Sequence, residues 1–586
     1  MKPVKTTDDK LNMWLRIAAL AAIVILISWP VLFMDMAKGH DLLFHLQRAE
    51  GIREDASWRN LPVRMQSNWM NGYGYPISIL YADFFLYIPA VFRKIGLPVM
   101  ASFRLFMLLV NTATVAISYF SFKAFNRGWA PVIATAAYTT ASYRLVDAYV
   151  RSAIGETLAI TFFPAVVACI YKIYTETDRR KRWKYTVILS FAFVSVILSH
   201  TLTTSMMLVV LALLCPISLI LFGIKGERLR QFWNIVSAGL ITIGLAMFFI
   251  VPFLDFYLTA DIDFALDKVN RIQGEGVDLV SLFDFVCNPF RNSSGAIQRT
   301  PGPVLMAVMI IAVICCIVAR VRKIRFQNHS RIVFEIVASL LLLLMSSHVF
   351  PWDFIEENVP VIGGIVTAIE FPMRYLAFAI VFLSFLTCDM INVMFAMLHD
   401  SSGNEKISGK RAVEYVCCLL IGLFCIFNVA QLCVYSRTYE KRADFVTRED
   451  LGVWEYYSMD FPLKNTTVDD LPLGLVYEGL ESMEVLSRNS NDFLIACTSG
   501  PEYGWIQLPV FNYKYYHAED MEDPSVKFEI HDGGNRTVGV LLPANYTGVC
   551  HIYWQEPILW RISELVSLLV FCACVAYLIN DRKKSI

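Results

Sequence analysis

The stretch that decides the fold is Trp14–Met34, WLRIAALAAIVILISWPVLFM, together with the polar segment that soon follows, Lys38–Arg48, KGHDLLFHLQR. The first run is long enough to cross a hydrocarbon core of roughly 30 Å. It is too long for the core of a signal peptide and no small-residue cleavage site follows it, so we predict a retained membrane span. The second segment places an acid, two histidines and an arginine where that helix would leave the bilayer.

The composition of the whole chain is that of a polytopic membrane protein. Of its 586 residues, 56% are hydrophobic and only 17% are charged, and the mean hydropathy is +0.51. Apolar runs of about twenty residues recur along the chain, more than a soluble core could use. The formal net charge is zero, so nothing attracts the chain as a whole to nucleic acid.

These apolar runs predict about twelve transmembrane helices. We place them at Trp14–Met34, Met100–Phe122, Ala130–Val146, Glu156–Ile173, Lys184–His200, Thr203–Phe222, Phe232–Tyr257, Pro303–Ala319, Ile332–Val349, Phe371–Phe395, Ala412–Val434 and Pro557–Ile579.

The short loops set the orientation of these spans. With alternating crossings, the basic loops share one side with the N-terminus, and the positive-inside rule assigns that side to the cytoplasm of a plasma-membrane protein. The segment Ile77–Phe92 is apolar, but Asp83 interrupts it, and counting it as a span would move the later basic loops outside. We therefore expect it to lie on the outer surface or to be re-entrant. The basic loops are Arg179–Arg182, Lys225–Arg230, Arg320–Arg325, Lys406–Arg411 and Arg582–Lys584.

A polar region before the last span predicts a separate domain. It contains alternating runs such as Gly504–Val510 and Thr537–Leu542, which are typical of a small antiparallel β domain resembling a sandwich. We divide the chain into a transmembrane domain at 1–435, an extracytoplasmic β domain at 436–556, and a final helix with a cytoplasmic tail at 557–586. Cys497 and Cys550 are the only cysteines of the β domain. An oxidising exterior favours a disulfide between them, with two free buried thiols as the alternative.

Charged residues gather at the predicted outer ends of the spans. Asp41 could accept a proton from a hydroxyl or bind a divalent cation, or it could cap the helix that begins after it. His45 and Arg48 would share the helix face that Asp41 begins. A site on this face is favoured because a solvated surface rarely needs two histidines and an arginine beside a membrane.

Two further motifs fall on the same side. Arg151 and Glu156 start one span, and Glu370 and Arg374 start another. Arginine suits phosphate because its planar fork donates two hydrogen bonds at once, although an interfacial ion pair and a snorkelling anchor explain the same residues. His200 ends another span on this face and, taken alone, indicates a structural role.

These segments resemble the YfhO-like bacterial membrane proteins, also described as 6-pyruvoyl-tetrahydropterin-synthase-related membrane proteins, which belong among the GT-C glycosyltransferases. The family usually shows Gln-Phe-Pro-Trp-Arg where this chain has Glu-Phe-Pro-Met-Arg, so the arginine is kept and the first residue differs. The similar segments keep the family's order: Asp41–His45 with Arg48, Asn71–Pro76, Arg151–Glu156, Glu370–Arg374 and Leu508–Tyr513.

The resemblance implies transfer of a sugar from a polyprenyl-phosphate carrier, on the outer face, to an envelope polymer or glycolipid. It implies that Asp41 is the base of an inverting reaction, and Arg374 and Arg151 would then hold the leaving phosphate. His45 would orient Asp41 or contact phosphate, and a divalent cation is possible but not required, with Asp41 as its ligand.

Residues in the similar segments leave two roles open. Tyr73 and Tyr75 could stack on a sugar ring or could pack the loop.

The expected partners are the lipid-linked sugar donor, the glycan or glycolipid acceptor and the bilayer, with no nucleic acid. Two other functions remain open from the sequence: a lipid or saccharide transporter (flippase), and a non-catalytic scaffold that binds the cell envelope.

Overall fold

The apolar runs of the sequence form long helices. The computed structural model describes residues 7–34, 36–58, 60–259, 271–285, 299–323, 328–360, 362–367, 369, 371–400, 407–439 and 474–585. Among these residues, eight helices are long and apolar enough to cross a membrane. They are or lie within α6 (Val99–Lys123), α9 (Ile154–Thr175), α11 (Thr201–Phe222), α12 (Arg228–Thr259), α13 (Pro303–Val321), the run of η6 (Pro372–Tyr375) and α17 (Leu376–Asp400), α18 (Ile407–Tyr439) and α19 (Ile558–Ser585).

The four other predicted spans are helical but are shorter, interrupted or charged. In α1 (Thr7–Ile27) the apolar part is Leu11–Ile27, and a second helix, α2 (Trp29–Phe33), follows with Pro30 in its first turn. The helix α10 (Arg179–Ile197) begins with basic residues, and α14 (His329–Met345) has 17 residues.

The prediction of one continuous helix at Ala130–Val146 is wrong. Helix α7 (Ala130–Thr139) ends early, and α8 (Ser142–Val146) follows after a break. Ala141 is extended (φ −54°, ψ 134°), and the amide of Ser142 donates to the carbonyl oxygen of Pro301 instead of to its own helix. The backbone bond lost within the helix is replaced by one to a neighbouring segment.

The structure confirms that Ile77–Phe92 does not form a spanning helix. This segment is divided among α4 (Ile77–Leu80), the 3₁₀ turn Phe84–Leu86 and α5 (Tyr87–Lys94). With α3 (Leu42–Asp55) they form a layer of short helices between α2 and α6. Other short helices close later loops at Trp352–Asn358 (α15) and Ile362–Thr367 (α16), with 3₁₀ turns at Met70–Gly72, Ile272–Glu275 and Ser281–Phe283.

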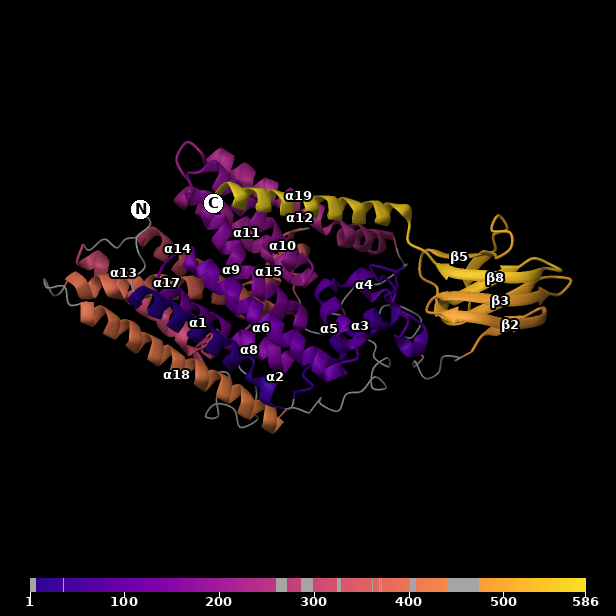
Figure 1. Cartoon of the computed structure of the whole chain (residues 1–586), viewed down its shortest axis with the longest axis horizontal. Coiled ribbons are helices and arrows are strands. Elements are labelled where there is room, and N and C mark those ends of the chain that lie inside the picture. Colours follow the sequence, from indigo (N-terminus) through magenta and orange to yellow (C-terminus); the bar gives the residue numbers. More distant parts are fainter. Residues whose placement is uncertain are drawn as a thin grey trace.

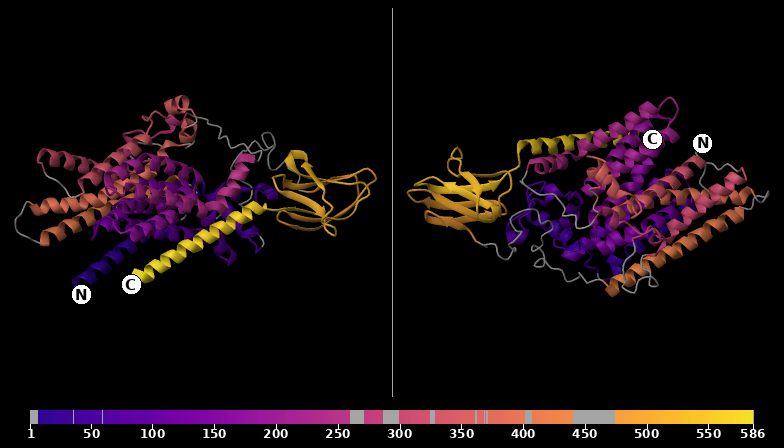
Figure 2. Two further views of the ribbon diagram at one scale, coloured as in Figure 1. Left: turned by 90° about the horizontal axis from the view of Figure 1, so that it is seen from above. Right: turned by 180° about the vertical axis from the view of Figure 1, so that it is seen from behind.

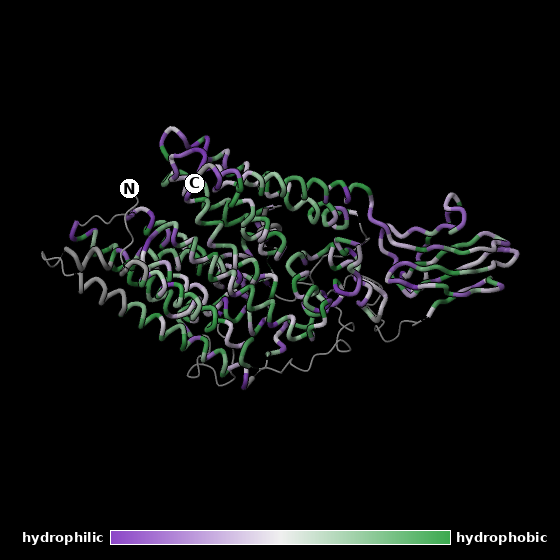
Figure 3. The backbone as a smooth tube through the Cα atoms, viewed as in Figure 1, coloured by the Kyte–Doolittle hydropathy of each residue, from purple (hydrophilic) through white to green (hydrophobic). Residues whose placement is uncertain are grey.

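The ends of the helical bundle differ in what they carry. Both termini and the turn between α11 and α12 lie at one end, whereas the layer of short helices and the β domain lie at the other (Figure 1; Figure 2). Hydrophobic residues dominate the helices between the two ends, and hydrophilic residues gather at the α11–α12 turn and in the β domain (Figure 3). We refer to the end with the β domain as the β-domain end, and to the other as the terminal end.

The region before α19 is an antiparallel β-sandwich, as predicted. One sheet has the strand order β1-β4-β7-β6 and the other β2-β3-β8-β5. Inward residues of both sheets, among them Ile495, Val510 and Val540, share one hydrophobic core. The strands are β1 (Val476–Glu478), β2 (Leu480–Asn489), β3 (Asp492–Ser499), β4 (Gly504–Phe511), β5 (Tyr516–Asp520), β6 (Glu529–Asp532), β7 (Thr537–Leu542) and β8 (Thr547–Trp554).

The predicted disulfide requires a correction. Cys497 and Cys550 are both free and buried. In the β3–β8 register Cys497 lies opposite Gly548, and Cys550 lies opposite Ile495. The two cysteines are therefore diagonal neighbours, whose Cα atoms lie about 7–8 Å apart. This separation is wider than the Cα–Cα spacing of a disulfide. The cysteine count could suggest a pair, but it could not supply the register.

Candidate active site

A buried ionic cluster lies where α9 and α17 begin. Nη1 of Arg151 donates to Oδ1 of Asp147 at 2.6 Å and to Oε2 of Glu156 at 3.1 Å. Nε of Arg374 lies 3.6 Å from the same Oε2, and the hydroxyl of Tyr143 donates to Oε1 at 2.6 Å. Glu156 is 1% exposed and Arg374 is 7% exposed. We call these five residues the Arg151 cluster.

The backbone around Arg151 explains how these groups meet. Residues Asp147–Arg151 form a π-helical turn, and Ser152 follows it in the left-handed region at φ 55°. Such turns widen a helix and are frequent at functional sites. Here the turn reverses the chain, so that Asp147, Arg151 and the start of α9 face one another.

Asp41 is brought beside this cluster by its backbone. The amides of His40 and Asp41 donate to the carbonyl oxygen of Arg151 at 3.0 and 2.9 Å. Gly39 permits the approach: it has φ +59°, and a Cβ there would lie 2.6 Å from Oγ of Ser152. Asp41 occupies the N-cap position of α3, but its side chain makes no capping hydrogen bond. Its carboxylate is half-buried.

A second close approach joins α9 to the α10–α11 turn. A Cβ at Gly155 would collide with the hydroxyl of Tyr81 and would lie 2.9 Å from the carbonyl oxygen of Ser199. Only glycine therefore lets the short-helix layer, the start of α9 and residue 200 meet at one point. His200 lies there, with its ring centre 5.5 Å from that of Tyr81.

His200 is a neutral hydrogen-bond donor facing the cluster. Its Nδ1 accepts the backbone amide of Thr203 at 3.2 Å and lies 2.7 Å from the Thr203 hydroxyl. Because Nδ1 accepts, the proton of the neutral ring lies on Nε2. Burial lowers the pKa of His200 well below its usual value, and the positive charges of Arg374 and Arg151 lower it further.

His45 and Arg48 lie in the same layer but are held by local partners. Nη2 of Arg48 donates to the carbonyl oxygens of Tyr81 and Ala82 at 3.0 and 2.8 Å, and its guanidinium lies 4.1 Å from the centre of the Tyr81 ring. Nη1 of Arg48 lies 3.5 Å from Nδ1 of His45. Burial, then Arg48, lowers the pKa of His45 well below its usual value. Arg48 therefore holds α3 against the Tyr81–Ala82 segment and also lines the site.

Asp83 was not among the predicted site residues, but it lies between the site and a large cavity. It is 9% exposed, and burial raises the pKa of its carboxyl to about 6. Within the described part of the chain, its Oδ2 has no hydrogen-bond partner. Asp83 lines a small cavity of about 10 Å³ with His45 and Arg48, and it also lines a cavity of about 1020 Å³.

The large cavity is almost entirely apolar and opens sideways. Its walls come from α4, α5, α10, α12 and α19. Phe84, Val91, Leu568 and Phe571 line it and are about half exposed on the surface of the bundle. The two cavities share Ala82, Asp83, Phe85 and Leu198. An apolar cavity open at the side of the bundle thus meets a small cavity that carries the polar groups of His45, Arg48 and Asp83.

Tyr73 and Tyr75 lie away from the ionic cluster. Both are 1% exposed and pack in an aromatic cluster with Phe511 and Tyr513 of the β domain. The amide of Phe511 donates to the carbonyl oxygen of Tyr73 at 3.1 Å, and their ring centres are 5.1 Å apart. The predicted stacking of these tyrosines on a sugar is therefore corrected to packing. The ring of Tyr73 lies against Phe511 of the β domain, and that of Tyr75 lies against Trp69.

The structure brings together most of the predicted charged residues. Asp41, Arg151, Glu156, His200 and Arg374 meet at the β-domain end, and Glu370 lies outside the described residues.

The residues that sequence reasoning missed are Asp147, Tyr143, Asp83 and Arg299. Asp147 follows the predicted span directly and stands four residues before Arg151, a spacing that could have indicated the pair. Burial and the neighbouring Arg151 lower the pKa of Arg299, which places a third arginine near the cluster.

The chemistry available at this place is binding of an anion and proton transfer. Two guanidiniums lie around one buried carboxylate, and Asp41 and a neutral histidine border them. Over the residues described, no group of three or more His, Cys, Asp or Glu side chains could hold a metal ion.

Comparisons with known proteins give similar structures but no family. No protein-family model and no curated protein matches the chain. The apo oligosaccharyltransferase of Archaeoglobus fulgidus is 12% identical with a TM-score of 0.41, over 73% of this chain and 57% of that one. The oligosaccharyltransferase AglB of the same organism, in complex with an inhibitory peptide and a dolichol-phosphate, is 12% identical with a TM-score of 0.40, over 74% and 57%.

A third similar structure is larger. The arabinofuranosyltransferase AftD from Mycobacteria is 12% identical with a TM-score of 0.34, over 73% of this chain and 27% of that one. The chain thus spans little more than half the length of the archaeal structures and about a quarter of the mycobacterial one.

Proposed function

We propose that this protein is a membrane glycosyltransferase that moves a sugar from a polyprenyl-phosphate carrier to an extracytoplasmic acceptor. One observation carries the proposal: an apolar cavity of about 1020 Å³ at the side of the bundle meets, at Asp83, a small cavity lined by Arg48 and Gly155. Gly155 precedes Glu156, which holds the two buried arginines of the Arg151 cluster. A lipid-linked sugar matches this arrangement, since it has an apolar chain for the cavity and a phosphate and a polar sugar for the ionic cluster.

The cavity is suited to the carrier's prenyl chain. Aromatic and aliphatic side chains of α5, α10, α12 and α19 line it, and an apolar chain buried there loses no hydrogen bonds. A chain entering between α5 and α19 would end at Asp83, Arg48 and His45. The head group would then lie next to the Arg151 cluster.

The arginines are suited to the phosphate. Arg151 and Arg374 are buried and share the carboxylate of Glu156. Their charges are poorly screened in this low-dielectric place, so they stabilise an anion more strongly than exposed arginines would. His200, protonated on Nε2, would add a neutral donor beside them.

Asp41 is the proposed base. It would take the proton of an acceptor hydroxyl while that oxygen attacks the anomeric carbon of the sugar. The bond from the anomeric carbon to the phosphate oxygen breaks, and the electron pair leaves with the phosphate. The product has inverted configuration at that carbon. No general acid is needed because the leaving group is a phosphate anion whose charge the arginines stabilise.

Glu156 is less suited to the role of base. Its two oxygens already accept the hydroxyl of Tyr143 and the guanidinium of Arg151. Asp41 is less buried than Glu156 and borders the cluster through its backbone bond to Arg151. We therefore assign Glu156 the role of holding Arg151 and Arg374 side by side. The acceptor would be a glycan polymer or a glycolipid of the cell envelope, and the face is extracytoplasmic in the plasma membrane.

The test is transfer by the purified full-length protein in lipid nanodiscs. Synthetic polyprenyl-phosphate sugars would be offered with envelope glycans and glycolipids from a deletion strain, and the products would be weighed by mass spectrometry. We expect an acceptor heavier by one sugar and release of the polyprenyl phosphate. Movement of intact donor between leaflets of a proteoliposome, without cleavage, would instead establish a transporter and overturn the proposal.

A further inference from the structure

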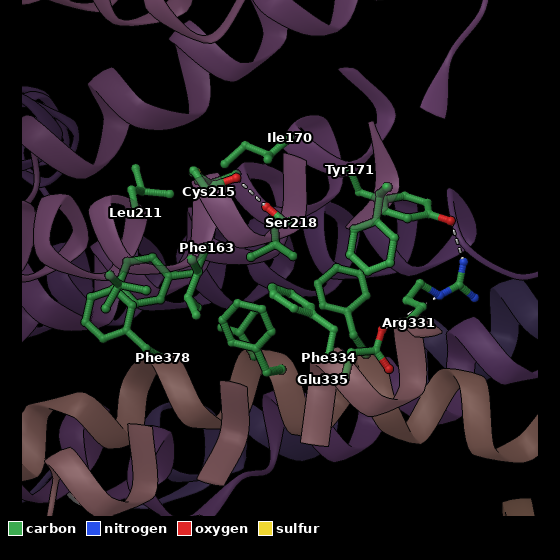
Figure 4. Close-up of a pocket in the computed structure, with 18 of the residues that line it drawn as sticks. Phe163, Ile170, Tyr171, Leu211, Cys215, Ser218, Arg331, Phe334, Glu335 and Phe378 are labelled. Carbon is green, nitrogen blue, oxygen red and sulfur yellow. Dashed lines mark hydrogen bonds and ion pairs between the residues drawn. The ribbon is translucent and has the colours of Figure 1, made fainter. Parts of the chain in front are cut away.

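A third cavity runs along α9 and α17 from Phe378, four residues after Arg374, to Arg331 at the terminal end of the bundle. It is enclosed by α9, α11, α14 and α17, and its open core measures about 70 Å³. Phe163 and Phe378 line one end, whereas Arg331 and Glu335 line the other (Figure 4). We call it the α14 cavity. The proposed sugar transfer uses none of its residues.

The charge of Arg331 is already balanced. Its Nε donates to Oδ2 of Asp389 at 2.6 Å, and its Nη2 donates to the other oxygen of the same carboxylate. Its Nη1 donates to the hydroxyl of Tyr171 at 2.9 Å. Asn126 donates a further hydrogen bond to Asp389 at 2.6 Å. The guanidinium of Arg331 is thus held by one aspartate and one tyrosine, and the carboxylate of Asp389 balances its charge.

Glu335 is left as an excess acid. Its side chain is 3% exposed, and its Oε1 lies 3.8 Å from Nε of Arg331, too far for a hydrogen bond. Over the described residues, neither of its oxygens has a hydrogen-bond partner. A buried carboxylate without donors is costly, so this place favours a ligand that brings a positive charge and N–H donors.

The remaining walls fix the shape and polarity of such a ligand. They are aromatic and aliphatic, with Phe125, Phe334, Phe382 and Phe385 nearest the charged end and aliphatic residues of α11 beyond them. Aromatic faces also favour an ammonium group. The volume is about half of a 150 Å³ cavity that holds benzene. The cavity therefore holds an ammonium group and the first few carbons of a slim chain, and the rest of a longer chain lies outside it.

From these observations we propose that the α14 cavity binds the primary ammonium group and adjoining chain of an amphiphile, with Glu335 as the counter-ion. Membrane aminophospholipids and free long-chain amines share this chemistry. The ammonium would donate to both oxygens of Glu335, and the chain would run toward Phe163 and Phe378. Occupation would join α14 to α9 and α11 and so stiffen the terminal end.

The experiment compares two probes on the full-length protein in detergent. Dodecylamine and dodecanol have the same chain and differ in the head group. We expect dodecylamine to raise the unfolding temperature saturably, because a ligand that binds the folded state stabilises it, and to bind at least tenfold more tightly than dodecanol. Glu335→Gln should remove this preference. Glu176→Gln, an acid at the same end that does not line the cavity, should keep it.

Two further measurements separate the sources and guard against misfolding. Native mass spectrometry with phosphatidylethanolamine and phosphatidylglycerol distinguishes a lipid ligand from a free amine. Adducts of phosphatidylethanolamine that Glu335→Gln abolishes would identify the ligand as the lipid. Leu211→Phe fills the cavity and leaves Glu335 intact, so it should also abolish amine binding. If dodecanol binds as tightly as dodecylamine, or Glu335→Gln binds amine like the wild type, the cavity is an apolar void with a protonated glutamate and the proposal is wrong.

Discussion

Nε of Arg374 lies 3.6 Å from Oε2 of Glu156, which also accepts a hydrogen bond from Arg151 at 3.1 Å. The carboxylate of Glu156, at the start of α9, therefore holds Arg151 from the turn that precedes α9 and Arg374 from the turn that precedes α17. Two guanidiniums held at one carboxylate, with Asp147 as a second acid beside Arg151, form a preorganised place for an anion.

Arg374→Ala should weaken both donor binding and turnover. The phosphate is charged in the donor and in the transition state, so the lost interaction affects both. A charge-assisted hydrogen bond contributes about 1.5–3 kcal/mol, which corresponds to roughly a 10- to 100-fold loss of donor affinity. Equilibrium binding of a polyprenyl-phosphate sugar and steady-state kinetics measure the two effects. Arg230→Ala, a half-exposed arginine at the start of α12 that pairs with Glu227, is the control and should change neither.

Asp41→Asn should abolish transfer while donor binding stays near the wild-type value. The amide keeps the shape of the side chain but cannot take a proton at neutral pH. Loss of a general base typically slows catalysis about 10²- to 10⁴-fold. Single-turnover measurement with purified donor and acceptor gives the rate, and Asp523→Asn in an exposed turn of the β domain is the control. Near-normal turnover of Asp41→Asn would contradict the assignment and make Glu156 the next candidate.

Much of the fold follows from hydrophobic patterning, and the failures occur where tertiary contacts decide. The apolar runs predict the helices, and Asp83 together with the basic loops correctly keeps Ile77–Phe92 from spanning. The break at Ala141 could not be foreseen, because the bond that replaces the helical one comes from Pro301, far along the chain. Likewise, the spacing of Cys497 and Cys550 says nothing about strand register.

The site was predictable as a set of residue types at helix ends, but not as a set of contacts. Positive-inside loops place Asp41, Arg151 and Arg374 on one side, and their convergence depends on Gly39 and Gly155, which permit two close backbone approaches. Tyr73 and Tyr75 look like sugar-stacking residues in the sequence because nothing there reveals that Phe511 packs on Tyr73 and Trp69 on Tyr75. In the sequence Asp83 only interrupts an apolar run, whereas in the structure it is a buried acid between the two cavities, with its pKa raised by burial.

Filling the large cavity should weaken binding of the donor's lipid chain and leave binding of its head group unchanged. Val194 lines it from α10 and is 7% exposed. Val194→Trp should raise the KM for long-chain polyprenyl donors by about tenfold or more, because a few CH₂ groups of the chain would no longer be buried, at a cost of about 0.8 kcal/mol each. The KM for short-chain donors should not change. Val485→Trp, on the exposed β2 strand, is the control. An equal effect on short and long donors would place the chain elsewhere.

The orientation of the bundle is testable by labelling. Cysteines introduced at Lys225 and Arg320 should react only after the membrane is made permeable, because these basic loops belong to the cytoplasmic side. A cysteine at Asp523 in the β domain should react in intact cells. External labelling of either basic loop would invert the topology and move the Arg151 cluster to the other face.

Asp83 predicts a pH dependence of stability that a single substitution should remove. Burial raises the pKa of its carboxyl from 3.8 to about 6, against smaller opposing effects of Arg48, a hydrogen bond from Ser78, and Arg64. The folded state therefore holds this proton more tightly than the unfolded state, so the contribution of Asp83 to stability is full below pH 4 and is lost as the pH rises from about 4 to 6. A shift of this size corresponds to about 3 kcal/mol.

Asp83→Asn carries no ionisable group and should unfold at a higher temperature than the wild type at pH 7.5, with the difference shrinking as the pH falls toward 4.5. Scanning fluorimetry of the full-length protein across this range measures it, with Asp523→Asn as the exposed control. If the two curves run parallel at every pH, the carboxyl of Asp83 is solvated, and the small cavity is open to water between His45 and the large cavity.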